Sequence, residues 1–477
     1  MSLTRTAISG MAWTYSQQFG GQIISFVVSV VLARLILPTE YGLIGMISIF
    51  MGIGTALFDG GLTSSLIRSK DVSEDDYSTV FYFNLFGSLI IYLILYILAP
   101  FIAEFYNQST LTNITRIYGL TFIVAAFGTV QNTILTRNLM FKKQAIIALP
   151  ALILSSATGL VMAYMNFGVW SLIASALVNT LVISSCLWFS SSWYPKLIFS
   201  KIKFKEHFHY GYKITVSSVM DIMFTNMYQI IIGRFYSAAQ VGFYTRANSL
   251  MMLPVANVSS ALNKVVFPLF SKVQDDTDRF RNAYKEIMLL VLFIITPIMV
   301  GMCVVAQPLI LLLFTKKWLP VVPIFQIICF TGILYPIHSY NLIVLQVKGR
   351  SDLFLKLEVF KKLLGMLILV ISFFYGFYAL LIGQVIFSLL ALFINTHYAG
   401  RMLNYKTYKQ LADILPIFAF GILMASITYI VDNMLHMQAN FLRIFIAPLC
   451  GLIGYLCIAW LVKFQSLTYI KNLMLKR

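Results

Sequence analysis

Seven ionisable side chains of this sequence lie inside long apolar segments, where a charge needs a specific reason. Two of them are acids and five are bases: Asp59, Asp221, Arg34, Arg116, Arg234, Arg246 and Lys264. An ionisable group inside a membrane-spanning helix is costly and usually faces a partner or a water-filled cavity. Arginine pairs bidentately with phosphate or carboxylate groups, whereas a carboxylate can hold a cation or a proton. The bases are therefore candidates for binding an anionic substrate, and the acids are candidates for ion coupling.

The five bases differ in how well an anchoring role explains them. Arg34 and Arg234 end their apolar segments, where an arginine either reaches lipid headgroups and caps the last carbonyls or attracts anions. Arg116, in NITRIYG, lies inside its segment and is the hardest to explain as an anchor, so it is the leading candidate for substrate contact. Arg246 is a further candidate, and so is Lys264, which snorkelling to the surface explains equally well.

The two acids each have a functional and a local explanation. Asp59, in ALFDGGLTSS, either binds a coupling ion or is satisfied by nearby hydroxyls such as that of Thr63. Asp221 shares one face of its helix with Ser217 and Thr225, because the three are spaced at i, i+4 and i+8. Such a stripe suits a water-lined cleft or a hydrogen-bonded seam between helices.

The elements that must position these residues are predicted to be transmembrane helices. The chain has 477 residues, of which 59% are hydrophobic and only 11% charged, and a soluble protein would carry about 25% charged residues. Apolar stretches of about 20 residues, each long enough to cross a bilayer, follow one another along the chain. They predict an all-α polytopic membrane protein with fourteen spans near residues 11–36, 41–67, 78–104, 112–136, 144–165, 168–190, 211–233, 247–270, 286–314, 320–346, 357–376, 378–400, 411–431 and 440–462.

The distribution of basic residues predicts the orientation of these spans. With the N-terminus in the cytoplasm, few of the 35 Lys and Arg residues fall on the outer side, as the positive-inside rule requires. Those few are Arg34, Arg116, Arg234, Arg246, Lys316, Lys317 and Arg443. Both termini are therefore expected in the cytoplasm, and the net charge of +18 is expected to face anionic lipid rather than nucleic acid.

Several sequence features occur twice and in the same order. RLILPTEYG at residues 34–42 corresponds to RFYSAAQVG at 234–242, and the acidic loop DVSEDD corresponds to VQDDTD. Pro100 corresponds to Pro308, and Asn132 to Asn341. Each copy contains six spans, so both begin on the same side of the membrane, as in parallel repeats related by an axis along the membrane normal. Two such lobes could rock against each other around a cleft, which predicts a transporter.

The repeat predicts four regions in the chain. Residues 1–192 form an N-terminal six-helix lobe, 193–210 a cytoplasmic interfacial linker, 211–402 a second six-helix lobe, and 403–477 two additional helices and a basic cytoplasmic tail. In the linker, lysines alternate with Phe, Ile and Tyr, as in a segment that lies on a membrane surface. His207 and His209 belong to this stretch, and we expect both to be interfacial.

Other function classes have little support in the sequence. The five cysteines lie in apolar runs without a CxxC pair, so neither a disulfide framework nor a metal site is indicated, and the sequence predicts no cofactor. GxxxxGK[ST], the phosphate loop of nucleotide hydrolases, does not occur. A membrane glycosyltransferase or polymerase would need a catalytic constellation and often a large outer loop, whereas the predicted outer loops are short. We therefore expect a protein that is not an enzyme.

The residues also resemble a known family over essentially the whole chain. GRFYSAAQVGFYTRANSLMMLPV, KVVFPLFSKVQDD, LPTEYGLIGM and FDGGLTSSLIRSKD look like the polysaccharide-unit exporters, the Wzx-type flippases of the multidrug/oligosaccharidyl-lipid/polysaccharide (MOP) superfamily. This resemblance implies the movement of undecaprenyl-diphosphate-linked oligosaccharides across the bacterial inner membrane by alternating access, for O-antigen, capsule or exopolysaccharide synthesis. The partners it implies are the lipid-linked substrate, membrane lipids, a proton or sodium ion and other polysaccharide-assembly proteins.

The resemblance leaves two alternatives and shows one departure. Lipid II flippases and MATE-type drug or cation exporters share the same architecture. Members of the family often carry an acid a few residues before the equivalent of Gly233-Arg234, where this chain reads NMYQIIIGR. Asn226 and Gln229 occupy this stretch, so any ion coupling would have to use Asp59 or Asp221.

Overall fold

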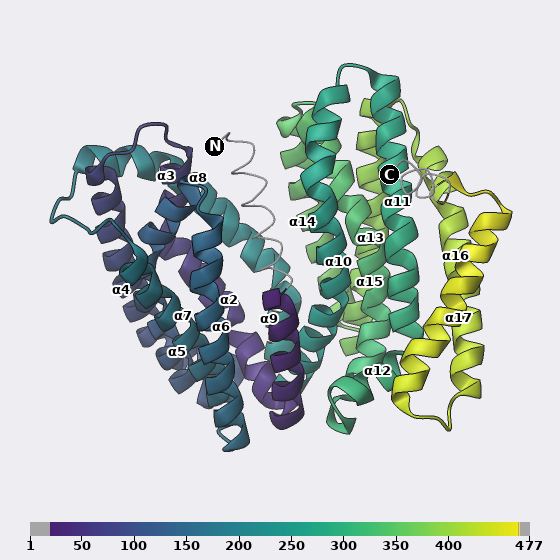
Figure 1. Cartoon of the computed structure of the whole chain (residues 1–477), viewed down its shortest axis with the longest axis horizontal. Coiled ribbons are helices and arrows are strands. Elements are labelled where there is room, and N and C mark those ends of the chain that lie inside the picture. The colour runs from purple at the N-terminus through teal and green to yellow at the C-terminus, as the bar shows by residue number, and fades with distance from the viewer. Residues whose placement is uncertain (1–19, 466, 468–477) are drawn as a thin grey trace. The chain divides into compact units, whose positions relative to one another are not determined.

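The fold is all-helical, as predicted. The computed structural model describes residues 20–465 and 467, apart from the side chains of residues 261–265, and over this part of the chain it contains helices and no β-strand (Figure 1). The described residues form two compact units, an N-terminal unit that ends at Gly242 and a C-terminal unit that begins at Phe243. Both termini lie outside the described residues, so their predicted location in the cytoplasm stays a prediction.

The helices follow one another with short connections. The N-terminal unit contains a helix over Gly20–Leu35, followed by α2 (Pro38–Asp59), α3 (Leu62–Arg68), α4 (Glu74–Tyr106), α5 (Thr110–Arg137), α6 (Phe141–Tyr164), α7 (Val169–Ser190), α8 (Lys201–Thr225) and α9 (Met227–Phe235). Helix α10 (Ala238–Val273) passes from this unit into the next. The C-terminal unit continues with α11 (Thr277–Val304), α12 (Ala306–Leu313), η1 (Lys316–Trp318), α13 (Val321–Val347), α14 (Ser351–Phe373), α15 (Phe377–Leu403), α16 (Thr407–Met434) and α17 (Asn440–Leu461).

Ten helices of the described residues are long and apolar enough to cross a membrane. They are α2, α4, α5, α6, α7, α11, α13, α15, α16 and α17. The other four predicted spans correspond to Gly20–Leu35, to α8 with α9, to α10 and to α14, which are shorter or more polar. The chain is thus a multi-pass membrane protein, and the count of fourteen spans stays a prediction.

The duplicated acidic loops form the N-caps of two corresponding helices. Ser73 precedes α4 and makes a capping box with Asp76, because the backbone N–H of Ser73 donates to the Asp76 carboxylate at 2.8 Å. Asp276 precedes α11, and its carboxylate accepts hydrogen bonds from the N–H groups of Asp278 and Arg279 at 3.1 and 3.0 Å. Acidic side chains satisfy the first N–H groups of a helix and interact favourably with its dipole. Helix capping therefore explains why an acidic loop occurs at the same place in both repeats.

The repeated element RLILPTEYG and RFYSAAQVG folds twice into the same turn. In each copy a helix ends one residue after the arginine, and a new helix begins four residues after it, at Pro38 and at Ala238. The two copies meet reciprocally within the N-terminal unit. A β-carbon added to Gly42 would lie 1.7 Å from the carbonyl oxygen of Ala238, and one added to Gly242 would lie 2.1 Å from that of Pro38. Only glycine permits this backbone approach.

The predicted linker is tied to the N-terminal ends of α3 and α4. The backbone N–H groups of Lys196 and Ser200 each donate at 3.1 Å to the hydroxyls of Ser78 and Thr79. Further along α8, Gly211 lies against the backbone of the Gly60-Gly61 turn between α2 and α3, where a β-carbon would approach the carbonyl oxygen of Gly60 to 2.3 Å. These contacts dock the first turns of α8 on the rest of the unit, whereas the membrane contact of the linker stays a prediction.

The interfacial placement predicted for His207 is wrong. Its side chain is 1% exposed, and its Nε2 lies 3.0 Å from Oδ1 of Asp76, which is 2% exposed. The other ring nitrogen, Nδ1, lies 2.8 Å from the hydroxyl of Ser65, and the ammonium of Lys203 lies 3.3 Å from the same Asp76 oxygen. A buried carboxylate is tolerated only with such partners. His209, two residues on, is exposed.

We predict that Gly42→Ala destabilises the protein because the new methyl group would overlap a backbone oxygen that cannot rotate away. The loss should exceed the roughly 1–3 kcal/mol that is usual for an overpacked core. Gly20→Ala is the matched control, since no atom lies within 4 Å of a β-carbon added there. The melting temperature and the monodisperse fraction in detergent measure the effect. Equal behaviour of the two variants would contradict the close approach.

We also predict different outcomes for the two neighbouring histidines. His207→Ala should lower the free energy of unfolding by about 1–3 kcal/mol, because the buried Asp76 carboxylate loses a hydrogen-bonding partner. His209→Ala should leave it unchanged, since that ring is exposed. Denaturation of both variants in the same detergent tests this prediction. An unchanged free energy of unfolding for His207→Ala would show that the contact between His207 and Asp76 does not stabilise the packing of α8.

Candidate functional site

Two of the predicted substrate-binding arginines contact the last turns of α4. Arg116 of α5 lies over the ring of Tyr96, with its guanidinium carbon 4.2 Å from the ring centre, and its Nε donates to the Tyr96 carbonyl at 3.4 Å. Arg234, in the last turn of α9, lies 5.2 Å from the ring centre of Phe105 and donates to the carbonyl of that residue. Cation–π contacts of this kind hold a guanidinium in one orientation.

Pro100 explains why Arg116 is needed at this position. Proline has no backbone N–H, so a proline within a helix leaves the carbonyl four residues earlier without its intrahelical donor. In α4 that carbonyl belongs to Tyr96, the group to which Arg116 donates. The contact gives Arg116 a structural role, and its predicted contact with substrate stays a proposal.

The two arginines do not converge on one small anion. Their partners Tyr96 and Phe105 are nine residues apart in α4, which corresponds to about 14 Å along the helix. This is too far for one diphosphate to contact both backbone positions. Arg34, the repeat counterpart of Arg234, is exposed in the last turn of the helix Gly20–Leu35.

The C-terminal unit holds the other two predicted bases. Arg246 lies near two aromatic rings, 5.7 Å from the centre of Phe314 and 5.9 Å from that of Trp318. Trp318 is fully buried, so the pair forms a fixed wall beside the guanidinium. Lys264 lies in α10, but its side chain falls outside the described part of the structure.

The two predicted coupling acids have different surroundings. Asp59 ends α2, and its carboxylate accepts hydrogen bonds from the Thr63 hydroxyl and from backbone N–H groups of the Gly60-Gly61 turn and of Thr63. The local explanation of Asp59 is therefore available in the structure. Asp221 is exposed on α8 together with Ser217 and Thr225, so the three share one exposed face, as their spacing predicts. Neither acid's predicted role in ion coupling is tested by these contacts.

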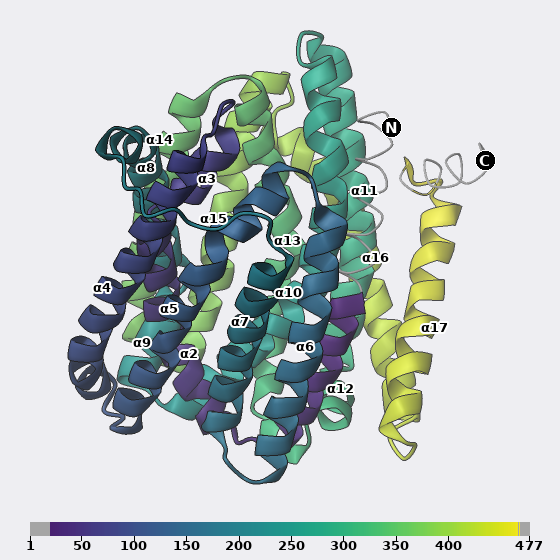
Figure 2. The same ribbon diagram turned by 60° about the vertical axis from the view of Figure 1, so that its left-hand side comes forward.

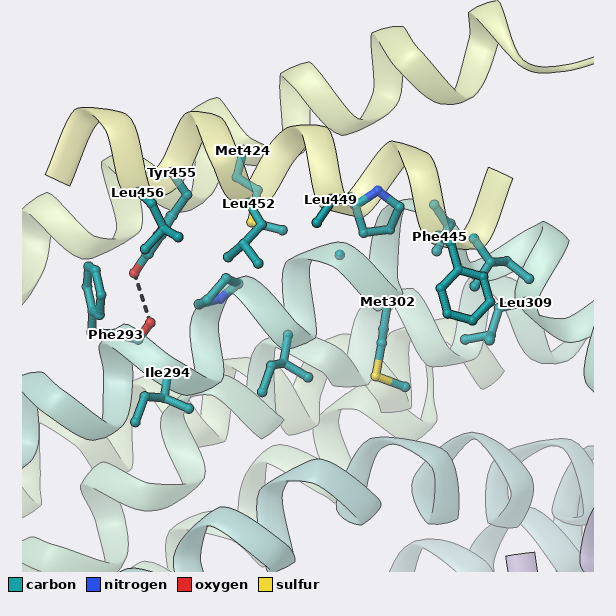
Figure 3. Close-up of a pocket in the computed structure, with 16 residues that line it drawn as sticks. Phe293, Ile294, Met302, Leu309, Met424, Phe445, Leu449, Leu452, Tyr455 and Leu456 are labelled. Atoms are coloured by element: carbon teal, nitrogen blue, oxygen red, sulfur yellow. Dashed lines mark hydrogen bonds between the residues drawn. The ribbon is translucent and has the colours of Figure 1, made fainter. Parts of the chain in front are cut away.

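A large apolar pocket lies between α17 and α11 in the C-terminal unit. Side chains of α17 such as Leu449 and Leu452 point toward Ile294 and Met302 of α11, and Leu309 of α12 closes one end (Figure 3). Its volume is about 570 Å³, within the range of about 300–1,000 Å³ for ligand pockets. No charged residue is among the described residues that line it.

The same proline rule applies at the other end of this pocket. Pro297 frees the carbonyl of Phe293 in α11, and the hydroxyl of Tyr455 donates to that carbonyl at 3.2 Å (Figure 3). Tyr455 comes from α17 and is fully buried. The hydrogen bond therefore fixes α17 against α11 while the pocket beside it stays apolar.

Several buried polar contacts were missed by the sequence reasoning. Lys361 is 8% exposed and pairs with Glu358 three residues earlier in α14, at 2.5 Å. Arg443 forms a bidentate pair with Asp432 across the α16–α17 turn, at 2.9 and 2.8 Å. The i,i+3 spacing of the first pair and the opposite charges flanking the turn in the second could have indicated both. The described residues contain no group of three or more His, Cys, Asp or Glu side chains that could hold a metal.

We predict that the cost of removing Arg116 depends on Pro100. Arg116→Met should destabilise the protein by about 1–3 kcal/mol, since the Tyr96 carbonyl loses its donor. In a Pro100→Ala background the new backbone N–H can satisfy that carbonyl, so the same substitution should cost about 1 kcal/mol less. Pro150→Ala, which removes a proline from the interior of α6, is the control background. Additive effects in a double-mutant cycle of denaturation energies would refute the link between Arg116 and Pro100.

The chain matches one protein family and several known proteins. The family described as "Polysaccharide biosynthesis protein" matches residues 31–323, more than half of the chain. The lipopolysaccharide biosynthesis protein WzxC of Escherichia coli K12 is 27% identical over 402 residues, which cover 83% of this chain and 80% of that protein. The teichuronic acid biosynthesis protein TuaB of Bacillus subtilis is 25% identical over 354 residues, covering 74% and 73%.

A solved structure supports the fold expected from the sequence. The lipid II flippase MurJ, in its inward closed conformation, has a TM-score of 0.75 with this chain and covers 96% of it and 99% of MurJ, at 17% identity. At this identity the likeness concerns the fold, which is that of the MOP transporters. The family match, its length and this fold together confirm the resemblance read from the sequence: the chain belongs to the polysaccharide biosynthesis protein family, among relatives of the Wzx type.

Proposed function

We propose that this protein is a flippase for undecaprenyl-diphosphate-linked oligosaccharide repeat units. It would move them from the inner to the outer leaflet of a bacterial inner membrane by alternating access and so supply O-antigen, capsule or exopolysaccharide synthesis. Family membership supports this proposal, as do relatives named for lipopolysaccharide and teichuronic acid biosynthesis. Both termini would lie in the cytoplasm.

The substrate sets a physical problem that the fold must solve. A diphosphate is multiply charged, and moving even one ion into hydrocarbon costs on the order of tens of kcal/mol by ideal solvation estimates. The polyprenyl tail, in contrast, gains about 0.8 kcal/mol for each methylene group that it buries in apolar surroundings. A carrier must therefore offer polar contacts to one end of the molecule while the other end stays in apolar surroundings.

The apolar pocket of the C-terminal unit is the observation that best supports a lipid-linked substrate. We propose that it holds part of the polyprenyl tail, because the described residues that line it are almost entirely hydrocarbon and thioether groups. The Phe293 carbonyl, which Pro297 leaves without its helical donor, already accepts a hydrogen bond from Tyr455. It therefore does not place an unpaired acceptor against the lipid.

The predicted bases are proposed to meet the anionic headgroup. A guanidinium that lies over an aromatic ring still has N–H groups at its edge, and these can bind phosphate oxygens. Arg116 and Arg246 would each act in this way, and Arg34, Arg234 and Lys264 are proposed as additional cations rather than as parts of one diphosphate site. Asp59 and Asp221 are proposed to bind a coupling proton or sodium ion. Other polysaccharide-assembly proteins would supply and consume the lipid-linked unit.

Transport in proteoliposomes tests the proposed function and the tail pocket together. The purified protein should accelerate the exchange of undecaprenyl diphosphate carrying a neutral trisaccharide between leaflets. Leu452→Trp should slow it, because excluding about two methylene groups costs about 1.6 kcal/mol, or roughly tenfold in affinity. The matched control is Ile453→Trp, since the adjacent residue does not line the pocket and is 54% exposed.

Each outcome of this experiment has a distinct meaning. If the trisaccharide lipid exchanges between leaflets no faster with the wild-type protein than in protein-free liposomes, the flippase proposal is rejected. If transport occurs and both Trp variants behave alike, the tail binds elsewhere. Exclusive transport of lipid II, or export of cationic drugs without lipid transport, would favour the two alternatives on the same fold.

A further inference from the structure

Helices α5, α6 and α7 of the N-terminal unit enclose a polar groove. Helix α7 packs closely against both α5 and α6, whereas α5 and α6 make few contacts with each other (Figure 2). Helix α7 therefore forms the floor of the groove, and the other two form its sides. Two pockets of about 500 and 470 Å³ lie along it, the second also lined by α2, and both are lined by Thr180 of α7.

The groove extends through much of the depth of a bilayer. On α5 its lining runs from Tyr118 to Asn132, a separation of fourteen positions that corresponds to about 20 Å. The hydrocarbon core of a membrane is about 30 Å thick. The two pockets together thus follow the helices for about two-thirds of that thickness.

The described lining of the groove combines hydroxyl and amide groups with apolar side chains and contains no charged residue. Its described polar lining consists of Thr55, Tyr118, Thr121, Thr129, Asn132, Gln144, Ser155, Ser175, Asn179, Thr180 and Ser184. Neither pocket has an Asp, Glu, Lys, Arg or His among its described lining residues. An anion or a cation would find no counter-charge there, and burying it would be unfavourable. A neutral ligand that carries both polar groups and apolar faces therefore suits this groove best.

Most of these hydroxyls already donate their proton to the protein backbone. Thr180 donates to the Ala176 carbonyl at 3.0 Å, and Thr129 donates to the Ala125 carbonyl at 2.9 Å, each within its own helix. A hydroxyl oxygen that donates once still has lone pairs that accept hydrogen bonds. The groove therefore presents acceptors, and what fits it best is a ligand with many O–H donors.

Amide side chains add further hydrogen-bonding groups at the junction of the two pockets and near the Asn132 end of the groove. Asn179 donates to the Ser155 hydroxyl at 3.3 Å, and Gln144 donates to the Asn132 side-chain carbonyl at 3.0 Å. An amide group has two donor protons and a carbonyl with two lone pairs. Asn179 therefore retains both donor and acceptor capacity, whereas the amide protons of Gln144 are used by Asn132 and Thr136, which leaves its carbonyl as an acceptor. Tyr118 also lines the second pocket and provides a flat apolar face.

We propose that this groove binds the neutral sugar residues of the lipid-linked substrate. Sugar rings combine many hydroxyl donors with apolar C–H faces, which matches the acceptors along the helices and the apolar side chains between them, such as Tyr118, Leu172 and Ile183. The continuity of the two pockets at Thr180 allows sugars to be held at successive depths in the membrane. This proposal rests on the proposed function and adds a neutral saccharide site that is separate from the bases assigned to the diphosphate.

Binding to the full-length protein in nanodiscs tests the saccharide site. The two probes are undecaprenyl diphosphate carrying a neutral trisaccharide and undecaprenyl diphosphate without sugar. Thr180→Val removes the acceptor at the junction with almost no change of shape, and it should weaken binding of the trisaccharide lipid about fivefold, as expected for one hydrogen bond. Binding of the sugar-free lipid should not change. Asn179→Leu is a second variant with the same expectation.

Thr158→Val is the matched control. Thr158 of α6 donates to the Leu154 carbonyl at 2.9 Å, as Thr180 does to its own helix, but it lines neither pocket. This variant should bind both lipids as the wild-type protein does.

Three results would overturn the saccharide site. Equal weakening of both lipids by Thr180→Val would assign these side chains a purely structural role. Unchanged binding of the trisaccharide lipid by both Thr180→Val and Asn179→Leu would place the sugars elsewhere, while transport by the wild-type protein would leave the proposed function intact. A wild-type protein that neither binds nor moves the trisaccharide lipid would reject the proposed function, and the saccharide site with it.

Discussion

The close backbone approach at Gly42 and Gly242 is the constraint on which the N-terminal unit depends. Each glycine lies against the carbonyl of a residue at the start of the other repeat's helix, so any side chain would force the helices apart. The turn that precedes each glycine is also the same in both copies. Since the turn sets the direction of the new helix and the glycine sets its distance, both parts of the nine-residue element are needed together. This explains why the sequence contains the element twice and why the arginine, turn and glycine keep the same spacing.

A second constraint is that a membrane-spanning helix must satisfy its own backbone. No water is present in hydrocarbon to bind a free carbonyl, so a proline inside such a helix needs a donor from elsewhere. Arg116 supplies it to Tyr96, and Tyr455 supplies it to Phe293. Such contacts change how a charged residue in an apolar segment should be interpreted. The charge of Arg116 has a structural reason as well as a proposed functional one, and only a cycle of substitutions separates the two.

The sequence alone predicted the helices, the repeat and the membrane class, because these depend on local patterns of apolar residues and capping groups. The acidic loops, for example, are N-caps that a short stretch of sequence specifies. Burial of His207 could not be predicted, since it depends on Asp76, 131 residues earlier in the chain, and a histidine among lysines and aromatic residues is typical of an interface. The groove between α5, α6 and α7 could not be predicted for a related reason. Ser, Thr and Asn in apolar helices have no distinctive spacing, and only the packing of α5, α6 and α7 brings them together.

The three kinds of surface in this chain suit the three parts of the proposed lipid-linked substrate. The pocket between α11 and α17 is apolar, which suits a polyprenyl chain because that chain has no group that could hydrogen-bond. The groove between α5, α6 and α7 is polar but uncharged, which suits hydroxyl-rich sugars and disfavours the diphosphate. Arg116, Arg234 and Arg246 lie against aromatic rings, so these three could meet an anion with little further loss of side-chain entropy. A drug exporter would have no use for a neutral groove of this length, and a transporter of small ions would have no use for the apolar pocket. The combination therefore favours an amphiphile whose polar part is long and largely neutral.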